Sequence, residues 1–574
     1  MRRQRQGTDR AGGSDHHRHA LLLADGLPLH GGQAGSIGLL QIPPTDLGRV
    51  EVIKGASSSL YGGAALGGVI NLVSRRPSEE FEGEVLANLT GQRGQDLTAY
   101  ASAPLGHHWS YSVTAGGHWQ ERRDLDGTGW ADIPAYQRYT LRPRLFWEGD
   151  GGGEALITAG MTRETRRGGT LPGSTVPDGS AFAQGLDTER FDAGLNLDFP
   201  VADALTFGVR ASAMTTDHRL IFGPEVENDR HRTGFVETSL TRTSGPHTLV
   251  GGIAVQVDDY ASEAFPVFDY RFTVPGVFAQ YDVDVSEALT VSGSVRADSH
   301  SEYGEFISPR LSALWRTGPW SLRASAARGY FAPTPFIGAI EETGLSRLEP
   351  LAGLQAEEAD TVSFDVGRRF GALETNVVVF QSRVSNEAVL VPTGNIQADG
   401  TDRTAIINAP GTNETYGSEL LLRYRYDHFV VTASYMYTRS SRTDAVSGVR
   451  GQTPLTPRHS AGFVAMWEDH DRGRLGFEAY YTGGQDLEDN PFRARSRPFV
   501  NMGILGEWII GDVSVFLNAE NILNIRQSRY DPLVRPTRAG DGRWTVDAWA
   551  PTDGFVVNGG VRIRFGGGHH GHDH

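Results

Sequence analysis

The residues with the clearest potential for chemistry lie in one glycine-rich stretch, VEVIKGASSSLYGGAALGGVINLVSRRP, at residues 50–77. Glycines close to a lysine are typical of loops that hold phosphate groups. The phosphate-binding pattern G-x-x-x-x-G-K-[ST] needs its lysine after the glycines, at the start of a helix. Here Lys54 precedes them, and the run from Gly62 to Gly68 does not give G-x-G-x-x-G. We therefore expect these glycines to serve the close packing of backbone segments.

The rest of the sequence offers no recognisable catalytic arrangement. It has no G-x-S-x-G nucleophile elbow, no H-E-x-x-H metal motif and no cysteine. We do not expect an enzyme. A membrane-barrel lipid hydrolase stays an alternative, because sequence pattern alone would not reveal its nucleophile. The formal net charge of −16 argues against a nucleic-acid partner, since phosphate binding calls for a basic surface.

The chain ends in the histidine-rich run GGGHHGHDH. Neutral imidazole suits Zn²⁺, Cu²⁺ and Ni²⁺, so this run contains candidate metal ligands: His569, His570, His572 and His574. Flexible histidine-rich tails also bind metal weakly without any function. We expect that no cofactor is required and that metal binding by the tail, if present, is weak.

The elements that position all these residues are predicted to be strands. In residues 289–297, apolar or small residues alternate with Thr290, Ser294 and other polar residues, including Arg296. Similar segments of roughly ten residues recur from Glu82 onward, as expected for transmembrane strands. A water-filled lumen accepts an arginine in mid-strand, whereas a soluble core would reject it. The pattern predicts an all-β membrane protein, and a large soluble β-protein is the alternative.

The connections between these segments alternate between short turns and long loops. This asymmetry is typical of an outer-membrane barrel, whose short turns face the periplasm. Pairing the segments gives an antiparallel transmembrane β-barrel of about 22 strands, a size at which the lumen is normally plugged. Counting strands from Glu82 puts the end of the chain on the periplasmic side. No stretch reaches the roughly 18 continuous apolar residues of a membrane helix.

The start of the sequence resembles the second half of the plug domain of TonB-dependent outer-membrane receptors. The resemblance is carried by LLLADGLPL and LGRVEVIKGASSSLYGGAALGGVINLVSRRP, in which Ala56 replaces the usual proline. The matching residues are Asp25, Gly26, Pro28, Arg49, Glu51, Lys54, Gly55, Tyr61, Gly62, Gly67, Gly68, Val69, Ile70 and Asn71. The segments SPRLSALWRTGPWSLRASAARGYFAPT, NETYGSELLLRYRY and GFVVNGGVRIRF are similar to barrel strands of the same family. The similarity runs from about Leu21 to Phe565.

This resemblance implies a partial plug inside the barrel. The expected parts are an unstructured or wrongly chosen N-terminus at 1–20, the C-terminal half of a plug at 21–80, a transmembrane barrel at 81–565 and a histidine-rich periplasmic tail at 566–574. The family's signal peptide, TonB coupling box and first plug half have no counterpart here. We therefore expect a chain that is truncated at its N-terminus relative to the family.

The resemblance also implies contacts between plug and barrel. Arg49, Glu51 and Lys54 are expected to form charge pairs with the barrel wall, and Glu419 in YGSELLLRY is a candidate partner. Such pairs hold the plug and still break when it is pulled, because lumen water replaces the lost partner.

Cargo that enters from outside would meet the plug apex and the long loops first. The segment HGGQAGSIG corresponds to an apical plug loop, where Gln33 and Ser36 can donate hydrogen bonds. Arginines and aromatic rings suit anionic, aromatic catecholate siderophores. The candidate contacts of this kind are Arg163, Arg166, Arg167, Arg328, Tyr330, Phe331, Tyr480 and Tyr481. The alternative is that these arginines bind lipopolysaccharide phosphates and the tyrosines belong to interface girdles.

The implied function is a TonB-dependent receptor in an outer membrane of the Gram-negative type. It would bind a large, scarce solute outside the cell and admit it when the TonB–ExbB–ExbD complex deforms the plug. A ferric siderophore is the expected cargo, and cobalamin or another metal complex is the alternative. A passive pore or a non-functional truncated receptor is a further alternative. We expect a monomer in contact with outer-membrane lipid and lipopolysaccharide.

Overall fold

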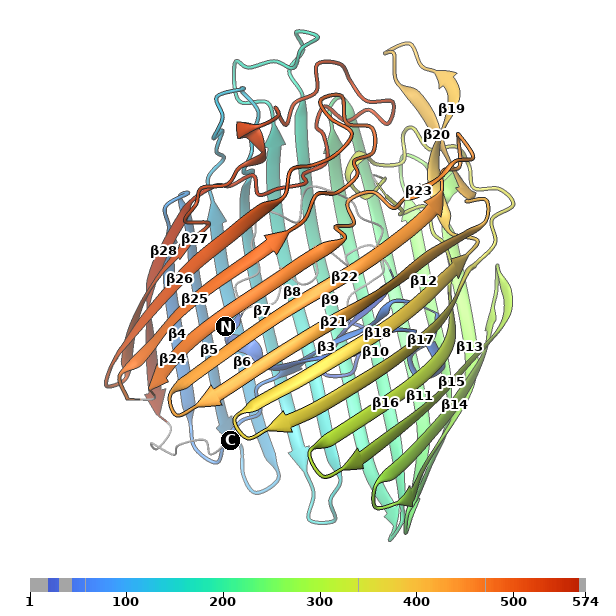
Figure 1. Ribbon diagram of the computed structural model, residues 1–574, viewed down its shortest axis with the longest axis vertical. Coiled ribbons are helices and arrows are strands. Elements are labelled where there is room, and N and C mark those ends of the chain that lie inside the picture. The colour runs from blue at the N-terminus through green and yellow to red at the C-terminus, as the bar shows by residue number, and fades with distance from the viewer. Residues whose placement is uncertain are drawn as a thin grey trace.

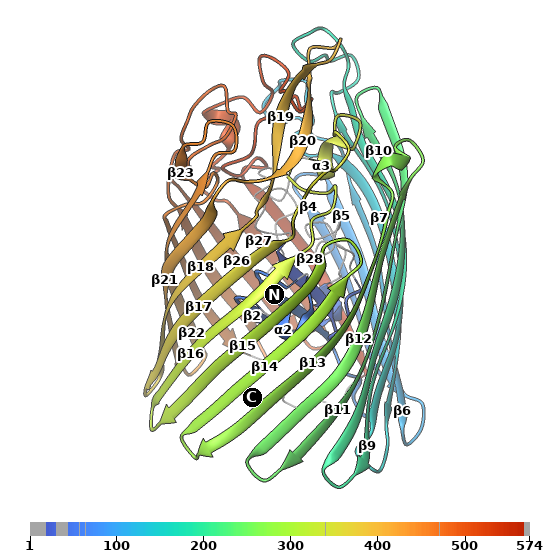
Figure 2. The same cartoon turned by 90° about the vertical axis from the view of Figure 1, so that its right-hand side faces the viewer.

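Strands account for most of the described chain, which comprises residues 19–29, 44–56, 58–63, 65–338, 340–469 and 471–566 of a computed structural model. They form a closed barrel, a three-stranded sheet inside it and a separate two-stranded hairpin (Figures 1 and 2). Within these described ranges, no helix is long and apolar enough to cross a membrane.

The barrel is a ring of antiparallel strands that closes where β28 pairs with β4. Its strands are β4 (Glu82–Thr90), β5 (Gly94–Pro104), β6 (Trp109–Gln120), β7 (Ala135–Glu148), β8 (Glu154–Gly169), β9 (Ala183–Ala202), β10 (Leu205–Phe222), β11 (Glu225–Ser244), β12 (His247–Ser262), β13 (Tyr270–Ser286), β14 (Leu289–His300), β15 (Gly304–Thr317), β16 (Trp320–Phe331), β17 (Glu357–Phe370), β18 (Leu373–Ser385), β21 (Thr412–Tyr426), β22 (Phe429–Thr443), β24 (His459–Asp469), β25 (Gly473–Thr482), β26 (Phe499–Ile510), β27 (Val513–Glu520) and β28 (Val556–Gly566). A three-residue piece, β23 (Arg450–Gln452), extends the pairing of β22. The predicted 22-stranded barrel is confirmed.

The alternation in each strand separates a lipid face from a lumen face. On β14, Val295 is 44% exposed on the outside, whereas its neighbour Arg296 is 4% exposed. On β15, Ile307 and Leu311 are likewise exposed. This is the reverse of a soluble protein, in which charged side chains are seldom buried. It fits a wall with hydrocarbon outside and polar groups inside.

Many of the barrel strands are longer than the roughly ten residues expected from the sequence. Crossing the hydrocarbon takes about 9–11 residues of a tilted strand. Both β9 and β11 have 20 residues, so the wall extends beyond the membrane. At one end of the barrel several connections are long, and the hairpin of β19 (Ala388–Ile396) and β20 (Asp402–Asn408) projects above the rim there (Figure 2). The same connections contain η3 (Pro266–Phe268), α3 (Ile340–Thr343) and η4 (Gln527–Arg529).

The small sheet inside the lumen, with its flanking helices, is called the plug below. In it β1 (Ala20–Ala24) runs parallel to β3 (Gly68–Ser74), and β2 (Leu47–Lys54) pairs with the other edge of β3 in the antiparallel sense. The flanking elements are η2 (Pro44–Asp46) and α2 (Ser58–Tyr61).

The glycines of the plug occupy positions with no room for a side chain. Gly68 has φ +129°, and a Cβ there would lie 2.4 Å from the carbonyl oxygen of Ile53 on the paired strand. A Cβ at Gly63 would lie 2.7 Å from the ring of Tyr330 in the barrel wall. Only glycine satisfies such contacts without displacing its neighbours. The glycine-rich stretch therefore packs the plug against itself and against the wall.

Candidate functional site

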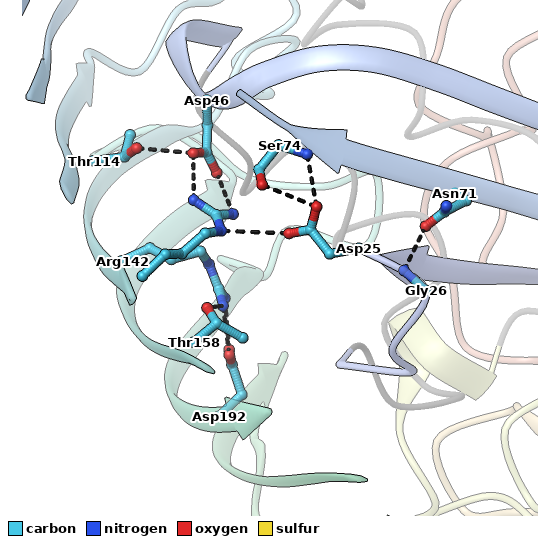
Figure 3. A network of polar contacts seen from close by, with 10 residues as sticks. Asp25, Gly26, Asp46, Asn71, Ser74, Thr114, Arg142, Thr158 and Asp192 are labelled. Carbon is cyan, nitrogen blue, oxygen red and sulfur yellow. Dashed lines mark hydrogen bonds and ion pairs between the residues drawn. The ribbon is translucent and has the colours of Figure 1, made fainter. Parts of the chain in front are cut away.

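A buried arginine on β7 fixes the plug to the barrel wall. Arg144 donates two hydrogen bonds to Asp46, from Nη1 to Oδ1 at 2.5 Å and from Nη2 to Oδ2 at 2.8 Å. Its Nε lies 3.3 Å from Oδ2 of Asp25, and Thr114 on β6 donates a further bond to Asp46 at 2.8 Å. Figure 3 shows these two carboxylates and Thr114. Paired, charge-assisted bonds of this kind are strong and fix orientation.

One of these carboxylates, that of Asp25, also holds the plug together. Oδ1 of Asp25, at the end of β1, accepts hydrogen bonds from the main-chain nitrogen and the hydroxyl of Ser74, at 2.8 and 2.9 Å. Asn71 accepts a bond from the nitrogen of Gly26 at 2.9 Å (Figure 3). Asp25 thus joins the ends of β1 and β3 and meets the wall with its other oxygen. A change at this point affects both the plug and its attachment.

A second arginine on the same face of β7 stays within the wall. Arg142 donates two bonds of 2.8 Å to Asp192 on β9 and one of 3.3 Å to Thr158 on β8 (Figure 3). Arg142 and Arg144 are two residues apart, so they share a face of the strand. Arg142 ties barrel strands together, whereas Arg144 ties the barrel to the plug.

The wall also donates hydrogen bonds to main-chain carbonyls of the plug. These bonds run from Arg210 to Gly26 at 3.2 Å, from Ser212 to Pro28 at 3.3 Å and from Arg310 to Ala56 at 3.1 Å. They approach the plug from β10 and β15, well separated along the barrel sequence. The two bonds with a charged arginine donor contribute about 1.5–3 kcal/mol each, and the neutral bond from Ser212 contributes about 0.5–1.5 kcal/mol. The plug is therefore held by the buried centre at Arg144 and by further hydrogen bonds from other parts of the wall.

Of the three charged plug residues expected to meet the wall, the structure brings one to a wall carboxylate. Lys54 pairs with Glu419 on β21. Arg49 and Glu51 pair with each other at 2.7 Å, and Asn71 donates to Glu51 at 2.9 Å. Two residues on one face of β2 lie closer to each other than to the barrel, which explains this pairing.

The predicted arginine cluster lies on β8 itself, below the loop that follows the strand. Each of its members pairs with a carboxylate: Arg163 with Glu189, Arg166 with Glu164, and Arg167 with Asp187, at 3.1, 2.6 and 2.5 Å. Arg328 pairs with Asp360 at 2.8 Å. These acceptors come from the same strand or from the strand beside it, where opposite charges stabilise the pairing. An anionic cargo would have to compete with those carboxylates.

The predicted aromatic contacts occupy different surroundings. Tyr330 is buried, and its ring is stacked on Phe306 with 3.9 Å between centroids. Phe331 meets His19 edge-on at 5.3 Å, and Tyr480 donates a bond to Glu478 at 3.0 Å. Tyr481 is exposed. Two groups of predicted residues lie outside the described residues: Gln33 and Ser36, and the tail histidines His569, His570, His572 and His574.

The charged centre of the interface was missed by sequence reasoning. Asp46 stands alone in the segment PPTDLG, where nothing marks it as a ligand for an arginine. Arg144 left a detectable signal, because Arg138, Arg142 and Arg144 share the inward face of one alternating strand. Three arginines on one lumen face indicate that carboxylates lie opposite them. Their partners cannot be named without the fold.

Two family models match the sequence. One, described as "TonB dependent receptor-like, beta-barrel", covers residues 86–522, and one for the "TonB-dependent Receptor Plug Domain" covers residues 5–69. The chain is 32% identical over 176 residues to a ferrioxamine receptor of Yersinia enterocolitica, a match that spans 30% of this chain and 22% of that receptor. It is 23% identical over 500 residues to an iron-regulated outer membrane virulence protein of Vibrio cholerae, covering 81% of this chain and 74% of the relative.

A further relative is the vitamin B12 transporter BtuB of Photobacterium profundum, 35% identical over 400 residues, with 65% of this chain and 60% of the relative covered. Among solved structures, a ferric enterobactin receptor of Pseudomonas aeruginosa superposes with a TM-score of 0.79 at 16% identity, covering 97% of this chain and 94% of that one. That likeness shows the fold. Because the barrel model covers most of the sequence, the chain belongs to the TonB-dependent receptor family, whose members are outer-membrane transporters and not enzymes.

Proposed function

We propose that this chain takes up a ferric siderophore across the outer membrane. The observation that carries the proposal is the match over 500 residues to an iron-regulated outer-membrane protein, since it extends over most of the barrel and is not confined to the plug. The ferrioxamine receptor supports the same class of cargo. The solute would bind among the long loops, and the energy for its passage would come from TonB through the plug.

The interface geometry supports a plug that is held firmly and released by force. The buried group of Arg144, Asp46 and Asp25 resists separation, because breaking a buried charge pair costs about 3–5 kcal/mol. The pair of Lys54 and Glu419 lies in water and costs about 0–1 kcal/mol to break. No step of this process changes a covalent bond in the cargo.

Cobalamin is the second candidate cargo, and one observation favours it. The vitamin B12 transporter of Photobacterium profundum has a higher identity to this chain, 35%, than the iron-regulated relative does. Both cargoes are large metal complexes, so the two proposals share the receptor mechanism and differ in the loops. They are separated by supplying each cargo alone.

The test is uptake in cells with the gene deleted and then restored. Radiolabelled ferric hydroxamate, ferric catecholate and cobalamin are supplied separately under limitation for iron or cobalamin. We expect restored cells to accumulate one ferric chelate, and a protonophore to abolish uptake while surface binding remains. Uptake of cobalamin alone would replace the siderophore proposal with the second candidate. No difference for any chelate between deleted and restored cells would overturn both.

A further inference from the structure

The lumen wall below the plug is basic along one part of the barrel. Strands β15, β16, β17, β18 and β21 follow one another in the barrel order. The bond from Arg310 to Ala56 and the pair of Lys54 and Glu419 identify the inward faces of β15 and β21. Because side chains alternate along a strand, every second residue from these contacts also faces the lumen. Towards the short turns, the inward arginines, called the basic wall below, are Arg310, Arg316, Arg323, Arg369, Arg423 and Arg425.

Few carboxylates balance the basic wall. Among the described residues on the same inward faces, from the plug contacts to the short turns, the carboxylates are Asp365, Glu374 and Glu419. Glu374 lies 2.5 Å from Arg369, and Glu419 pairs with Lys54 of the plug. The chain as a whole has a formal net charge of −16. This part of the lumen therefore has a charge opposite in sign to that of the whole chain.

Most arginines of the basic wall have no carboxylate partner. Glu374 stands opposite Arg369 on one side and opposite Arg423 on the other, and it pairs with Arg369. Within the part of the chain that the structure describes, no ion pair is formed by Arg316, Arg323, Arg423 or Arg425. The inward arginines of β7, in contrast, each meet a carboxylate. A lumen surface with uncompensated positive charge attracts anions and raises their local concentration.

A cavity of about 330 Å³ opens at the foot of the basic wall. Its lining consists of Arg369, Gly371, Ala372, Glu374, Arg423 and Arg425. Gly371 and Ala372 form the short turn between β17 and β18, so the cavity lies at the periplasmic end of the barrel, at the bottom in Figure 1. Guanidinium groups offer several donors in a fixed plane and suit the oxygens of carboxylates and other anionic chelators.

The plug lies next to the upper part of the basic wall. The main-chain nitrogen of Ala56 donates to Thr361 on β17 at 3.4 Å, and Lys54 meets Glu419 on β21. The side chain of Lys54 is 65% exposed, so water reaches the junction between plug and wall at this place. Arg423 follows Glu419 by four residues, which is about 13 Å along the strand. Wet lumen beside the plug and the cavity at the periplasmic end are therefore served by the same row of arginines.

We propose that the basic wall and its cavity form an anion site that receives a negatively charged ferric chelate as it passes the plug towards the periplasm. The inference rests on the proposed uptake of a ferric siderophore and specifies the charge of the cargo. A ferric ion held by three catecholate groups has a triple negative charge, whereas one held by three hydroxamate groups is neutral. The basic wall favours the catecholate type.

Several weak contacts suit passage better than one strong site. Conduction through a pore requires binding that is favourable enough for entry and weak enough for release. Inward residues on one strand, such as Arg423 and Arg425, are about 7 Å apart, and both are exposed to lumen water. An anion can therefore exchange one arginine for the next without losing all its partners. The last arginines of the row line the cavity, from which the periplasm is reached.

The first test is binding of a trisulfonated pyrene dye to the purified, detergent-solubilised full chain. Fluorescence anisotropy is measured at about 10 mM salt, where charges interact over about 30 Å. The test variant combines Arg423→Gln with Arg425→Gln. The matched control is Arg472→Gln, because Arg472 is 80% exposed on the short turn between β24 and β25 and lies outside the cavity. A shift in gel migration on heating shows that each protein is folded beforehand.

We expect saturable dye binding in the wild type and in Arg472→Gln, and at least about fivefold weaker binding in the double variant. Absence of saturable binding in the wild type overturns the proposal. Equal affinity in the three proteins also overturns it. An equal loss in the control and the double variant would mean that the dye responds only to net charge, and the assignment to the cavity would be wrong.

The second test separates passage from capture in cells. The double variant should bind a ferric tricatecholate at the cell surface with wild-type affinity, because the changed arginines lie below the plug. We expect its uptake to be at least about threefold slower. Unchanged uptake, an equal loss of surface affinity, or equal slowing of a neutral ferric trihydroxamate overturns the role in passage. If the wild type accumulates no ferric chelate, the siderophore proposal fails, and dye binding still decides whether the anion site exists.

Discussion

Two of the charge pairs between the plug and the barrel differ in their contact with water. The side chains of Arg144 and Asp46 are each 4% exposed, whereas those of Lys54 and Glu419 are 65% and 23% exposed. The first pair has a fork of two hydrogen bonds and a second carboxylate beside it, and the second pair joins two flexible side chains at a wet surface. The same kind of charge pair is therefore buried and rigid at Arg144 but exposed and flexible at Lys54.

The difference predicts where the plug resists a pulling force. Once a buried pair separates, its charges have no water to replace the partner, so its rupture is expensive. An exposed pair exchanges its partner for water at little cost. We infer that the Arg144 centre determines whether the plug stays in the lumen. The pair of Lys54 and Glu419 helps to orient the plug but adds little to the strength of its attachment.

The largest expected effect comes from Arg144→Met. This change leaves two buried carboxylates without their cation, a loss of about 3–5 kcal/mol in the attachment of the plug. We expect the purified variant to show steady ion conductance in planar lipid bilayers, where the wild type shows none. A wild type that conducts by itself would establish a passive pore.

The matched control for this change is Arg142→Met. Arg142 lies on the same strand face, but its partner Asp192 belongs to the barrel. We expect this variant to stay closed, with its cost confined to barrel stability. Equal conductance from both variants would mean that the loss of any lumen arginine opens the channel, and the assignment of the attachment to Arg144 would be wrong.

A smaller effect is expected from Asp46→Asn. The amide keeps the shape and one acceptor, and Arg144 keeps Asp25 as a charged partner, so the loss is about 1.5–3 kcal/mol. The measurement is the urea concentration at which conductance begins, compared with wild type and with Asp192→Asn. We expect an onset between those of wild type and Arg144→Met. An onset equal to that of wild type would show that Asp25 alone carries the attachment.

The two pairs also show what the sequence can and cannot predict. The barrel follows from local alternation, as in residues 289–297, because the lipid and lumen faces act on every strand in the same way. The contact of Lys54 with Glu419 was expected from family resemblance. The Arg144 centre joins residues 98 positions apart, and no local pattern specifies which carboxylate an inward arginine meets. The three-dimensional register determines that choice.

A steric test separates packing from charge at the same interface. A Cβ at Gly63 would lie 2.7 Å from Tyr330, and overpacking of this kind costs about 1–3 kcal/mol. We expect Gly63→Ala to lower the urea concentration at which conductance begins. The control is Gly293→Ala, since a Cβ there meets nothing within 4 Å. A larger shift from Gly63→Ala than from Arg144→Met would make packing, and not the buried charges, the main attachment.

The smallest effect is expected from Lys54→Gln. An exposed pair contributes about 0–1 kcal/mol and is screened by salt, so the shift in conductance onset should be slight at low ionic strength and absent near 1 M salt. Glu419→Gln and the double variant complete a cycle that isolates the pair from other effects of each change. A coupling that persists in high salt, or that equals the loss in Arg144→Met, would show that the lumen around Lys54 excludes water. The two pairs would then not differ in their contact with water, and the comparison between them would be wrong.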